Sequence, residues 1–218
     1  MFILVLIVDF VTEYGENNIE KMMKVDSEVE SCKDNGKLNK FYHTSAGMFF
    51  AIRPCGVIVG CEEINSHESL TQAFIFLRKV FFKNNDVSRI VKFIGYNRAC
   101  TLKPFIERLS LIGVPGAEEM LNTVELLVDI FHVMKHTNKC CMPLHNNENC
   151  KFHPRLDKFS EIHGANTESC EQAFKRLNRF KHSTRMMTRM KRIVFFYIVN
   201  NDYNERLEER SKLKAKNL

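Results

Sequence analysis

The chain has 218 residues, of which 44% are hydrophobic and 27% charged, the balance of an ordinary globular protein rather than a disordered or membrane-spanning one. Its formal charge of +6 is unevenly placed. Residues 151–218 hold 16 Lys and Arg against eight Asp and Glu, whereas residues 1–150 hold 16 against 18. A basic segment on a near-neutral body suggests contact with phosphate or another acidic surface, although a solvated helix face explains it equally well.

The eight cysteines are spread along the chain, which has no convincing secretion signal. The opening MFILVLIVDF lacks a positive n-region and a small-residue cleavage site, and it is too short to span a bilayer. We therefore expect a nuclear or cytoplasmic protein that is not secreted, with no membrane partner and with reduced thiols. Clustered thiols in such a protein favour metal binding over disulfides.

Hydrophobic periodicity and turn residues predict the elements in chain order. The first part of the chain is predicted to contain a strand at 3–11, a loop or weakly helical insertion at 13–43, and a hairpin of 46–54 and 56–64. Helices and strands then alternate: a helix at 68–82, a strand at 88–97, a helix at 98–111 interrupted near Pro104, and a strand at 123–132. An irregular stretch follows at 138–165, then one long helix or two consecutive helices at 166–199, and a charged tail at 201–218 that is expected to fray. This order indicates an α/β fold, a mixed sheet flanked by helices, compatible with a ribonuclease-H-like domain over 1–200.

Four segments resemble, in the same order, segments of the Kyakuja–Dileera–Zisupton (KDZ) transposases. They are GMFFAIRPCGVIVGCEEINSHESL, FIGYNRACTLKPFI, VDIFHVMKHTNKC and NTESCEQAFKRLNR. The resemblance covers roughly residues 46–200, and its strength lies in four motifs in register. It implies a eukaryotic DNA transposase with a ribonuclease-H-like core of the DDE type. The 201–218 tail lies outside it.

The resemblance implies three acidic positions: on the first strand, after the fourth strand and on a late helix. Glu171 matches the late glutamate, and Asp9 is in the right order for the first acid. Asn97 stands where the family has an aspartate. Each residue also has a plain structural explanation: a turn or cap acid for Asp9, which we favour there, a turn residue for Asn97, and a helix-start charge for Glu171.

DNA cleavage in such folds uses two divalent cations about 3.5–4 Å apart, held by carboxylates. Asn97 offers only a neutral amide, so we expect a degenerate, catalytically impaired site, with Mg²⁺ or Mn²⁺ bound only if the site is active. Asp129, at the predicted end of the strand at 123–132, is a substitute acid that we do not favour.

A string of His and Cys residues follows Asp129 within the His/Cys-rich segment at 132–165. His132 and His136 are four apart and would share a helix face, and two His with two Cys suit tetrahedral zinc. Together with the family pattern, this favours a structural zinc bound by four ligands: His132, His136, Cys140 and Cys150. Substitute ligands are Cys141, His145 and His153. The alternative is a half-buried histidine pair with inert thiols.

The basic stretch after Glu171 predicts contact with the DNA phosphate backbone, which supplies affinity without sequence choice. The candidate residues are Lys175, Arg176, Arg179, Lys181, Arg185 and Arg189. We therefore expect a transposase-derived DNA-binding protein, which could form a homo-oligomer and takes no small-molecule substrate. The alternatives are an active two-metal transposase or nuclease, and a protein-interaction module that kept the fold for its surface.

Overall fold

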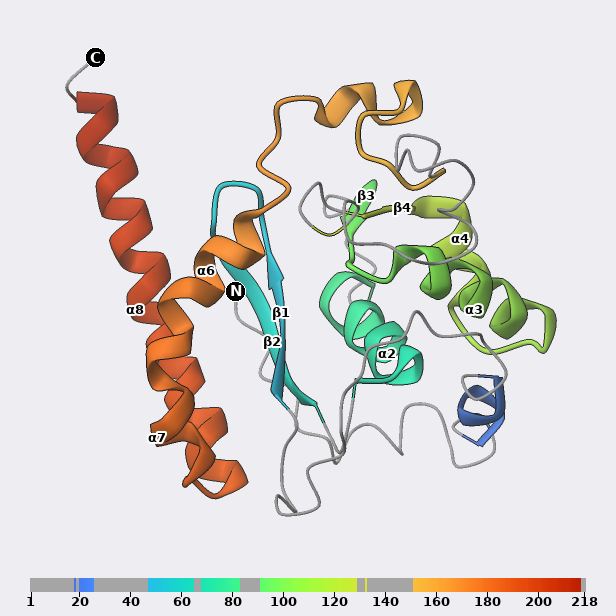
Figure 1. Cartoon of the computed structure of the whole chain (residues 1–218), viewed down its shortest axis with the longest axis horizontal. Coiled ribbons are helices and arrows are strands. Elements are labelled where there is room, and N and C mark those ends of the chain that lie inside the picture. The colour runs from blue at the N-terminus through green and yellow to red at the C-terminus, as the bar shows by residue number, and fades with distance from the viewer. Residues whose placement is uncertain are drawn as a thin grey trace. The chain divides into compact units, whose positions relative to one another are not determined.

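A computed structural model describes residues 18, 20–25, 47–64, 68–82, 91–128, 132 and 151–216. These residues form a mixed α/β protein with two small sheets and a long C-terminal helix (Figure 1). They fall into two compact units. The hairpin unit contains the described residues of 47–68 and 168–216, and the parallel-strand unit contains those of 18–25, 69–132 and 151–167.

The hairpin predicted at 46–64 is confirmed. Strands β1 (Gly47–Ile52) and β2 (Ile58–Ile64) pair in antiparallel register, with a bulge between Ala51 and Ile52. The connecting turn contains Gly56 at φ 92°, a left-handed conformation that favours glycine. A Cβ there would meet Leu207 at 3.4 Å, an ordinary contact distance, so the backbone conformation rather than lack of space favours glycine here.

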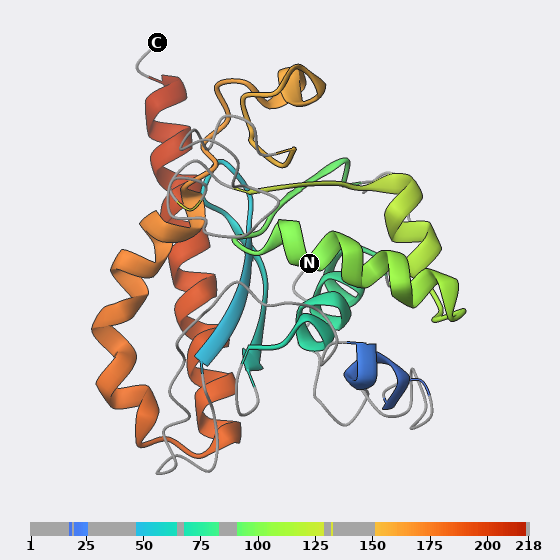
Figure 2. The ribbon, with the colours of Figure 1, turned by 45° about the vertical axis from the view of Figure 1, so that its right-hand side comes forward.

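Two helical segments cover one face of this hairpin. The first runs through α6 (Ser169–Leu177), the 3₁₀ turn η4 (Asn178–Phe180) and α7 (Lys181–Arg185); the second is α8 (Arg189–Lys216). Figure 2 shows α8 running back beside the first segment. Of the two arrangements expected at 166–199, the structure has two consecutive helical segments. Residues 201–216, where a charged tail is expected, belong to α8.

Strand alternation explains which hairpin side chains meet these helices. Phe50 lies opposite Cys61, and Met48 lies opposite Glu63, so these four side chains project from one face. Phe50 packs against Phe174 of α6 and Phe196 of α8, with ring centroids 5.5 and 5.8 Å apart in edge-to-face geometry. One phenylalanine therefore holds both helical segments to the hairpin.

Two asparagines, one helical turn apart, attach α8 to β2. Asn200 donates from Nδ2 to the Cys61 Sγ at 3.2 Å. Asn204 accepts at Oδ1 from the Ile58 amide at 2.9 Å and donates from Nδ2 to the Ile58 carbonyl at 2.8 Å. Burial raises the pKa of the Cys61 thiol from its ordinary value of 9.0 to about 11, so this thiol is protonated and unreactive at neutral pH.

The parallel-strand unit is built on β3 (Phe93–Gly95) and β4 (Glu125–Leu127), which pair in parallel. Hydrogen bonds from Glu125 N to Lys92 O and from Tyr96 N to Leu127 O extend this ladder at both ends. The strands predicted at 88–97 and 123–132 therefore exist, although the structure shows them shorter. Asp129 lies outside the described residues.

Helices α2 (Leu70–Phe81) and α3 (Ala99–Leu111) form the apolar core of this unit. The helix predicted at 68–82 is confirmed: Ser69 caps it by accepting from the Gln72 amide at 3.2 Å. Phe74 of α2 and Phe105 of α3 are wholly buried. A further helix, α4 (Ala117–Thr123), begins after Gly116 in the left-handed region at φ 78°.

The predicted interruption of the helix at Pro104 is wrong. Helix α3 is continuous from Ala99 to Leu111 with Pro104 inside it. Proline removes one helical hydrogen bond and strains the preceding turn. The neighbouring Leu102, Phe105 and Ile106 are all fully buried, and their packing outweighs that local cost.

Residues 151–165 are largely irregular, as predicted, with one short 3₁₀ helix, η3 (Asp157–Ile162). Phe159 of η3 is buried against Phe93 of β3, with ring centroids 6.0 Å apart. The Phe152 carbonyl accepts from the Val128 amide just beyond β4. This segment therefore packs on the parallel strands although it has little regular structure.

Candidate nucleic-acid interface and catalytic positions

The helical segment from Ser169 to Arg185, here called the basic arm, sorts its side chains by chemistry. Ala173, Leu177 and Thr184 are buried on its inner side. The Thr184 hydroxyl donates to the Phe180 carbonyl at 3.0 Å, which satisfies it within the helix. Its exposed basic side chains are Lys175, Arg176, Arg179, Lys181 and Arg185. No acidic residue occurs between 172 and 185, so Glu171, in the first turn, is the one carboxylate in the arm's own sequence.

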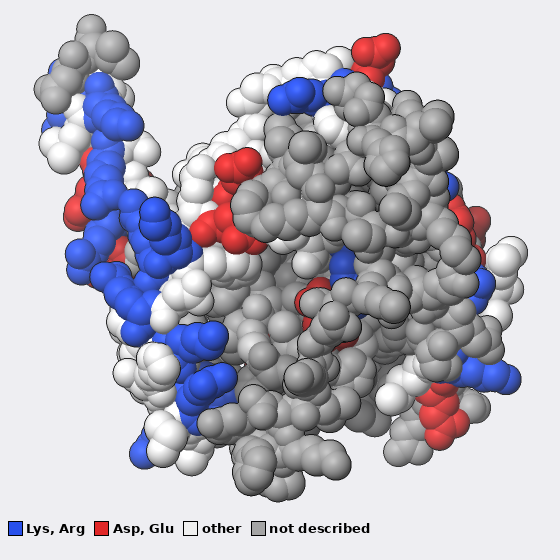
Figure 3. Space-filling view, viewed as in Figure 1, with Lys and Arg blue, Asp and Glu red and all other residues white. Residues whose placement is uncertain are grey.

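Two arginines of the arm place their guanidinium groups over aromatic rings. The Arg176 guanidinium lies over the Tyr203 ring of α8, 5.6 Å from its centroid, and that of Arg179 lies over Phe180 at 4.8 Å. Stacking on a ring leaves the in-plane N–H groups of arginine available for an anion. Figure 3 shows Lys and Arg gathered along the helices of the hairpin unit.

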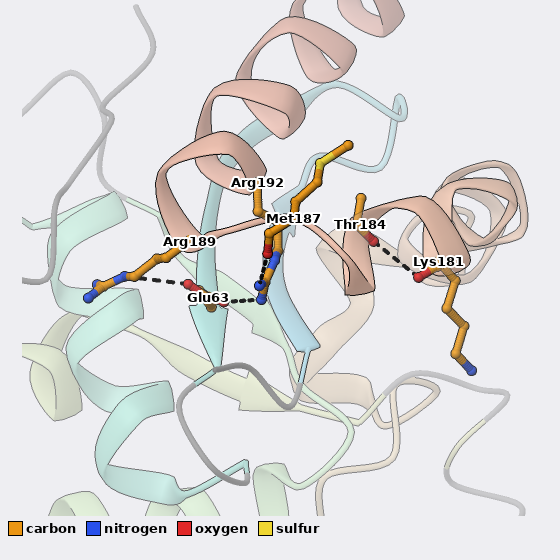
Figure 4. Close-up of polar contacts among 6 residues, drawn as sticks. All are labelled: Glu63, Lys181, Thr184, Met187, Arg189 and Arg192. Carbon is orange, nitrogen blue, oxygen red and sulfur yellow. Dashed lines mark hydrogen bonds and ion pairs between the residues drawn. The ribbon is translucent and has the colours of Figure 1, made fainter. Parts of the chain in front are cut away.

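The arginines at the start of α8 have a different environment. Arg192 is buried and forms an ion pair with Glu63 of β2, and it also donates to the Met187 carbonyl at 2.8 Å. Arg189 lies 3.4 Å from the second oxygen of Glu63 (Figure 4). The carboxylate of Glu63 is itself buried, so it needs this positive charge. We call these three residues the Glu63 cluster.

The Glu63 cluster separates Arg189 from the other predicted DNA-binding residues. Five of the six candidates lie exposed on the basic arm, whereas Arg189 is half-exposed and shares its charge with Glu63. Hydrophobic periodicity could not distinguish Arg189 from the other five basic residues, because its partner Glu63 is 126 residues away in the sequence. The only signal available in the sequence was the paired acids of GCEEI on the predicted second strand.

Glu171 lies in the first turn of α6, in the hairpin unit, and is half-buried. A carboxylate is favoured at this end of a helix by the backbone dipole, whatever its function. The structure therefore agrees with the simple structural role of Glu171 and leaves its catalytic assignment a prediction.

Asn97 lies just past the carboxyl end of β3, in the parallel-strand unit. It occupies a turn that is closed by a hydrogen bond from the Ala99 amide to the Tyr96 carbonyl at 3.0 Å. Its side-chain Oδ1 is shielded from solvent. Ligands in α/β proteins bind beyond the carboxyl ends of parallel strands, so Asn97 is placed at the edge where chemistry would be expected.

Most of the other predicted site residues lie outside the described residues: Asp9, His136, Cys140, Cys150, and the substitutes Asp129, Cys141 and His145. His132 is described as half-buried. His153 is buried and accepts at Nδ1 from the Arg155 amide at 3.1 Å, so this nitrogen is occupied within the chain. Within the described ranges, no three His, Cys, Asp or Glu side chains group closely enough to hold a metal ion.

Comparison with protein families identifies the class. The family model of the Kyakuja-Dileera-Zisupton transposases matches residues 17–204, which is most of the chain. The chain therefore belongs to the KDZ transposase family. The matched span includes Asn97, Glu171 and the whole basic arm, and it begins after Asp9. No curated protein and no solved structure gives a significant match.

One further property concerns membranes. Among the helices that the structure describes, none is both long and apolar enough to span a bilayer.

Proposed function

We propose that this transposase-derived protein binds DNA through the phosphate backbone, using the basic arm. The observation that carries the proposal is the run of five exposed Lys and Arg side chains, from Lys175 to Arg185, with no acid among them. Contacts of this kind give affinity that depends strongly on salt and little on sequence. If all five reach phosphates, the logarithm of the binding constant should fall with the logarithm of salt concentration with a slope of about −4.5.

Fluorescence anisotropy with a labelled DNA duplex, over a series of salt concentrations, tests this. Arg179→Gln should weaken binding and make the salt slope shallower by about 0.9, the share of one phosphate contact. Lys214→Gln, which removes an exposed cation at the far end of α8, is the matched control and should change neither. Equal losses in both variants would refute a localised interface.

Arg189 provides an internal comparison within the same assay. Its charge is already opposed by Glu63, so Arg189→Gln should reduce DNA affinity less than Arg179→Gln does. An equal or larger loss would mean that Arg189 leaves Glu63 to contact DNA.

We further propose that the DDE-type site is degenerate, with Asp9, Asn97 and Glu171 as its three positions. An amide carries no charge and bridges two divalent cations poorly, so the donor set fits a metal pair less well than three carboxylates would. We therefore assign no cleavage step to this site. Mg²⁺ or Mn²⁺ would bind here with useful affinity only in an active form.

Nicking of supercoiled plasmid with Mg²⁺ or Mn²⁺ tests the degenerate site. The unaltered chain should not nick, and Asn97→Asp should gain activity that Glu171→Gln removes again. Nicking by the unaltered chain that Glu171→Gln abolishes would instead support an active nuclease.

The fold proposal is a ribonuclease-H-like arrangement. It is supported by the order of elements: an antiparallel hairpin, a helix, then parallel strands joined through helices. The described strands form two separate two-stranded sheets, whereas a ribonuclease-H-like fold requires one continuous sheet that contains both pairs. An experimental structure of the chain that shows one such sheet would support the proposal, and one that shows two unconnected sheets would exclude it.

A structural zinc held by His132, His136, Cys140 and Cys150 also remains a proposal, as does a nuclear location. Elemental analysis should find one zinc per chain, lost in Cys140→Ser. Retention of zinc in that variant would require another ligand, such as Cys141, in its place.

A further inference from the structure

The turn between α7 and α8, residues 186–188, exposes one apolar side chain. Met186 is 87% exposed, whereas its neighbour Met187 is half-buried. A single exposed apolar residue is common on protein surfaces and needs no explanation by itself. Met186 differs in its surroundings, because it follows the basic arm directly and lies at the tip where the two helical segments meet (Figure 2).

Hydrogen bonds hold this turn in a defined position. The Met186 amide donates to the Ser183 carbonyl at 3.3 Å. Arg192 donates to the Met187 carbonyl at 2.8 Å, and Arg192 is itself paired with the buried Glu63 (Figure 4). The backbone of the turn is therefore tied to strand β2, so the Met186 side chain is presented to solvent from a fixed support.

The charge around the turn has one sign. No Asp or Glu occurs between residues 172 and 201, a span that holds eight Lys and Arg. Exposed cations lie on both sides of Met186 in the sequence, Arg185 before it and Lys191 after it. An apolar side chain between cations suits a DNA duplex, where charged phosphates flank apolar base steps. A lipid surface fits less well, because binding to it grows with buried apolar area and the turn offers one side chain.

We propose that the α7–α8 turn is a wedge, which inserts the Met186 side chain between two base pairs from the minor groove of DNA held by the basic arm. This inference rests on the proposed function and adds to it a deformation of the bound DNA. Apolar wedges, methionine among them, partly unstack a base step and bend the duplex by about 20 to 90°. Pyrimidine–purine steps unstack most easily, so the wedge also gives a mild preference for DNA that contains TA or CA steps.

Two labelled short duplexes, each with one central TA step, test the wedge with the full 218-residue chain at saturating concentration. The first carries a fluorescent adenine analogue at that step, and its emission rises when the base loses its stacking. The second carries a donor and an acceptor dye at its ends, and energy transfer increases when the duplex bends. Both signals should rise when the unaltered chain binds.

Three substitutions of Met186 separate apolar insertion from side-chain size. Met186→Ala should return both signals to the values of free DNA, and Met186→Gln, similar in length but polar, should do the same. Met186→Leu should keep both. The matched control is Met23→Ala, at a methionine that is 61% exposed elsewhere in the chain, and it should change neither signal. Circular dichroism of each variant checks that folding is intact.

The salt dependence of binding distinguishes the wedge from the backbone contacts. Met186→Ala removes no charge, so its salt slope should equal that of the unaltered chain, whereas Arg179→Gln makes the slope shallower. A chain that binds DNA with the expected slope but changes neither signal would overturn the wedge and leave the proposed function standing. Signals that persist in Met186→Ala would do the same.

Two further outcomes would also overturn the wedge. A chain that does not bind DNA at all would remove the proposed function along with it. Binding to vesicles of phosphatidylserine and phosphatidylcholine that Met186→Ala abolishes, with no bend in DNA, would assign the turn to a membrane surface instead.

Discussion

Helix α3 of the parallel-strand unit and helix α8 of the hairpin unit attach to their surroundings by different chemistry. The buried side of α3 is almost entirely apolar and includes Leu102, Phe105, Ile106 and Leu109. Helix α8 is more than twice as long but buries only Arg192, Phe196 and Asn200. Helix α3 is therefore held by a large apolar area, and α8 by one buried aromatic contact together with a few specific polar ones.

This difference has a physical consequence. Apolar burial tolerates small shifts of a helix, because it depends on area rather than on direction. Buried ion pairs and amide hydrogen bonds tolerate little, because a lost partner leaves a buried polar group unsatisfied. The polar contacts of α8 therefore fix its register on β2, while contributing less total burial.

The largest effect should come from the apolar unit. Phe105→Ala should lower the free energy of unfolding by about 4 kcal/mol, through lost burial and the cavity left behind. Urea denaturation followed by circular dichroism measures this, with exposed Leu111→Ala as control. Hydrogen-exchange mass spectrometry should show faster exchange in α2 and α3 than in α8. Uniform acceleration through both units would contradict their separate packing.

Removing Glu63 should cost about 3 kcal/mol, because Arg192 would stay buried without a counter-charge. Glu63→Leu is the test variant, measured by urea denaturation. The double variant Glu63→Leu with Arg192→Leu should recover much of the loss, since no buried charge remains. A double variant as unstable as the single one would show that the cluster contributes more than charge compensation.

The Cys61 thiol makes stability depend on alkaline pH. The folded thiol keeps its proton to about pH 11, whereas the unfolded thiol loses it near pH 9.0. The contribution of Cys61 to the free energy of unfolding is therefore fully present below pH 9. It is lost as the pH rises toward 11, and amounts to about 2 to 3 kcal/mol. Thermal denaturation should show a shallower decline in this range for Cys61→Ala than for the unaltered chain. Cys55→Ala, at an exposed thiol, should decline as the unaltered chain does.

The smallest effect concerns one amide. Asn204→Ala should cost about 1 to 2 kcal/mol, because it removes two hydrogen bonds to the Ile58 backbone. Asn204→Asp keeps the acceptor and loses the donor, so its free energy of unfolding should lie between those of the unaltered chain and Asn204→Ala. The measurement is urea denaturation. Exchange of the Ile58 amide, followed by NMR, should accelerate in Asn204→Ala and stay slow in Asn204→Asp.

Sequence patterns predict what depends on local periodicity. The hairpin around Gly56 and the helix at Leu70–Phe81 both have local signals, and both are present. The pattern at 166–199 left one long helix or two consecutive ones open, and the structure has two segments. Pro104 misled because the packing around it is tertiary, and α4 was missed because seven residues give a weak periodic signal. The ion pair between Glu63 and Arg192 joins residues 129 apart in sequence, so no local pattern reveals it. The basic arm was predictable as a run of charged residues, but the pairing of Arg189 with Glu63 was not.

The amide of Asn204 also has a consequence for how this protein behaves at high concentration. It occupies the N–H and C=O of Ile58, the two groups that an incoming strand would need at that point of β2. A side chain from a distant helix thus takes the place of a neighbouring strand. The start of β2 is thereby closed to edge-to-edge pairing, which makes Asn204 a guard against sheet-mediated aggregation as well as an attachment for α8.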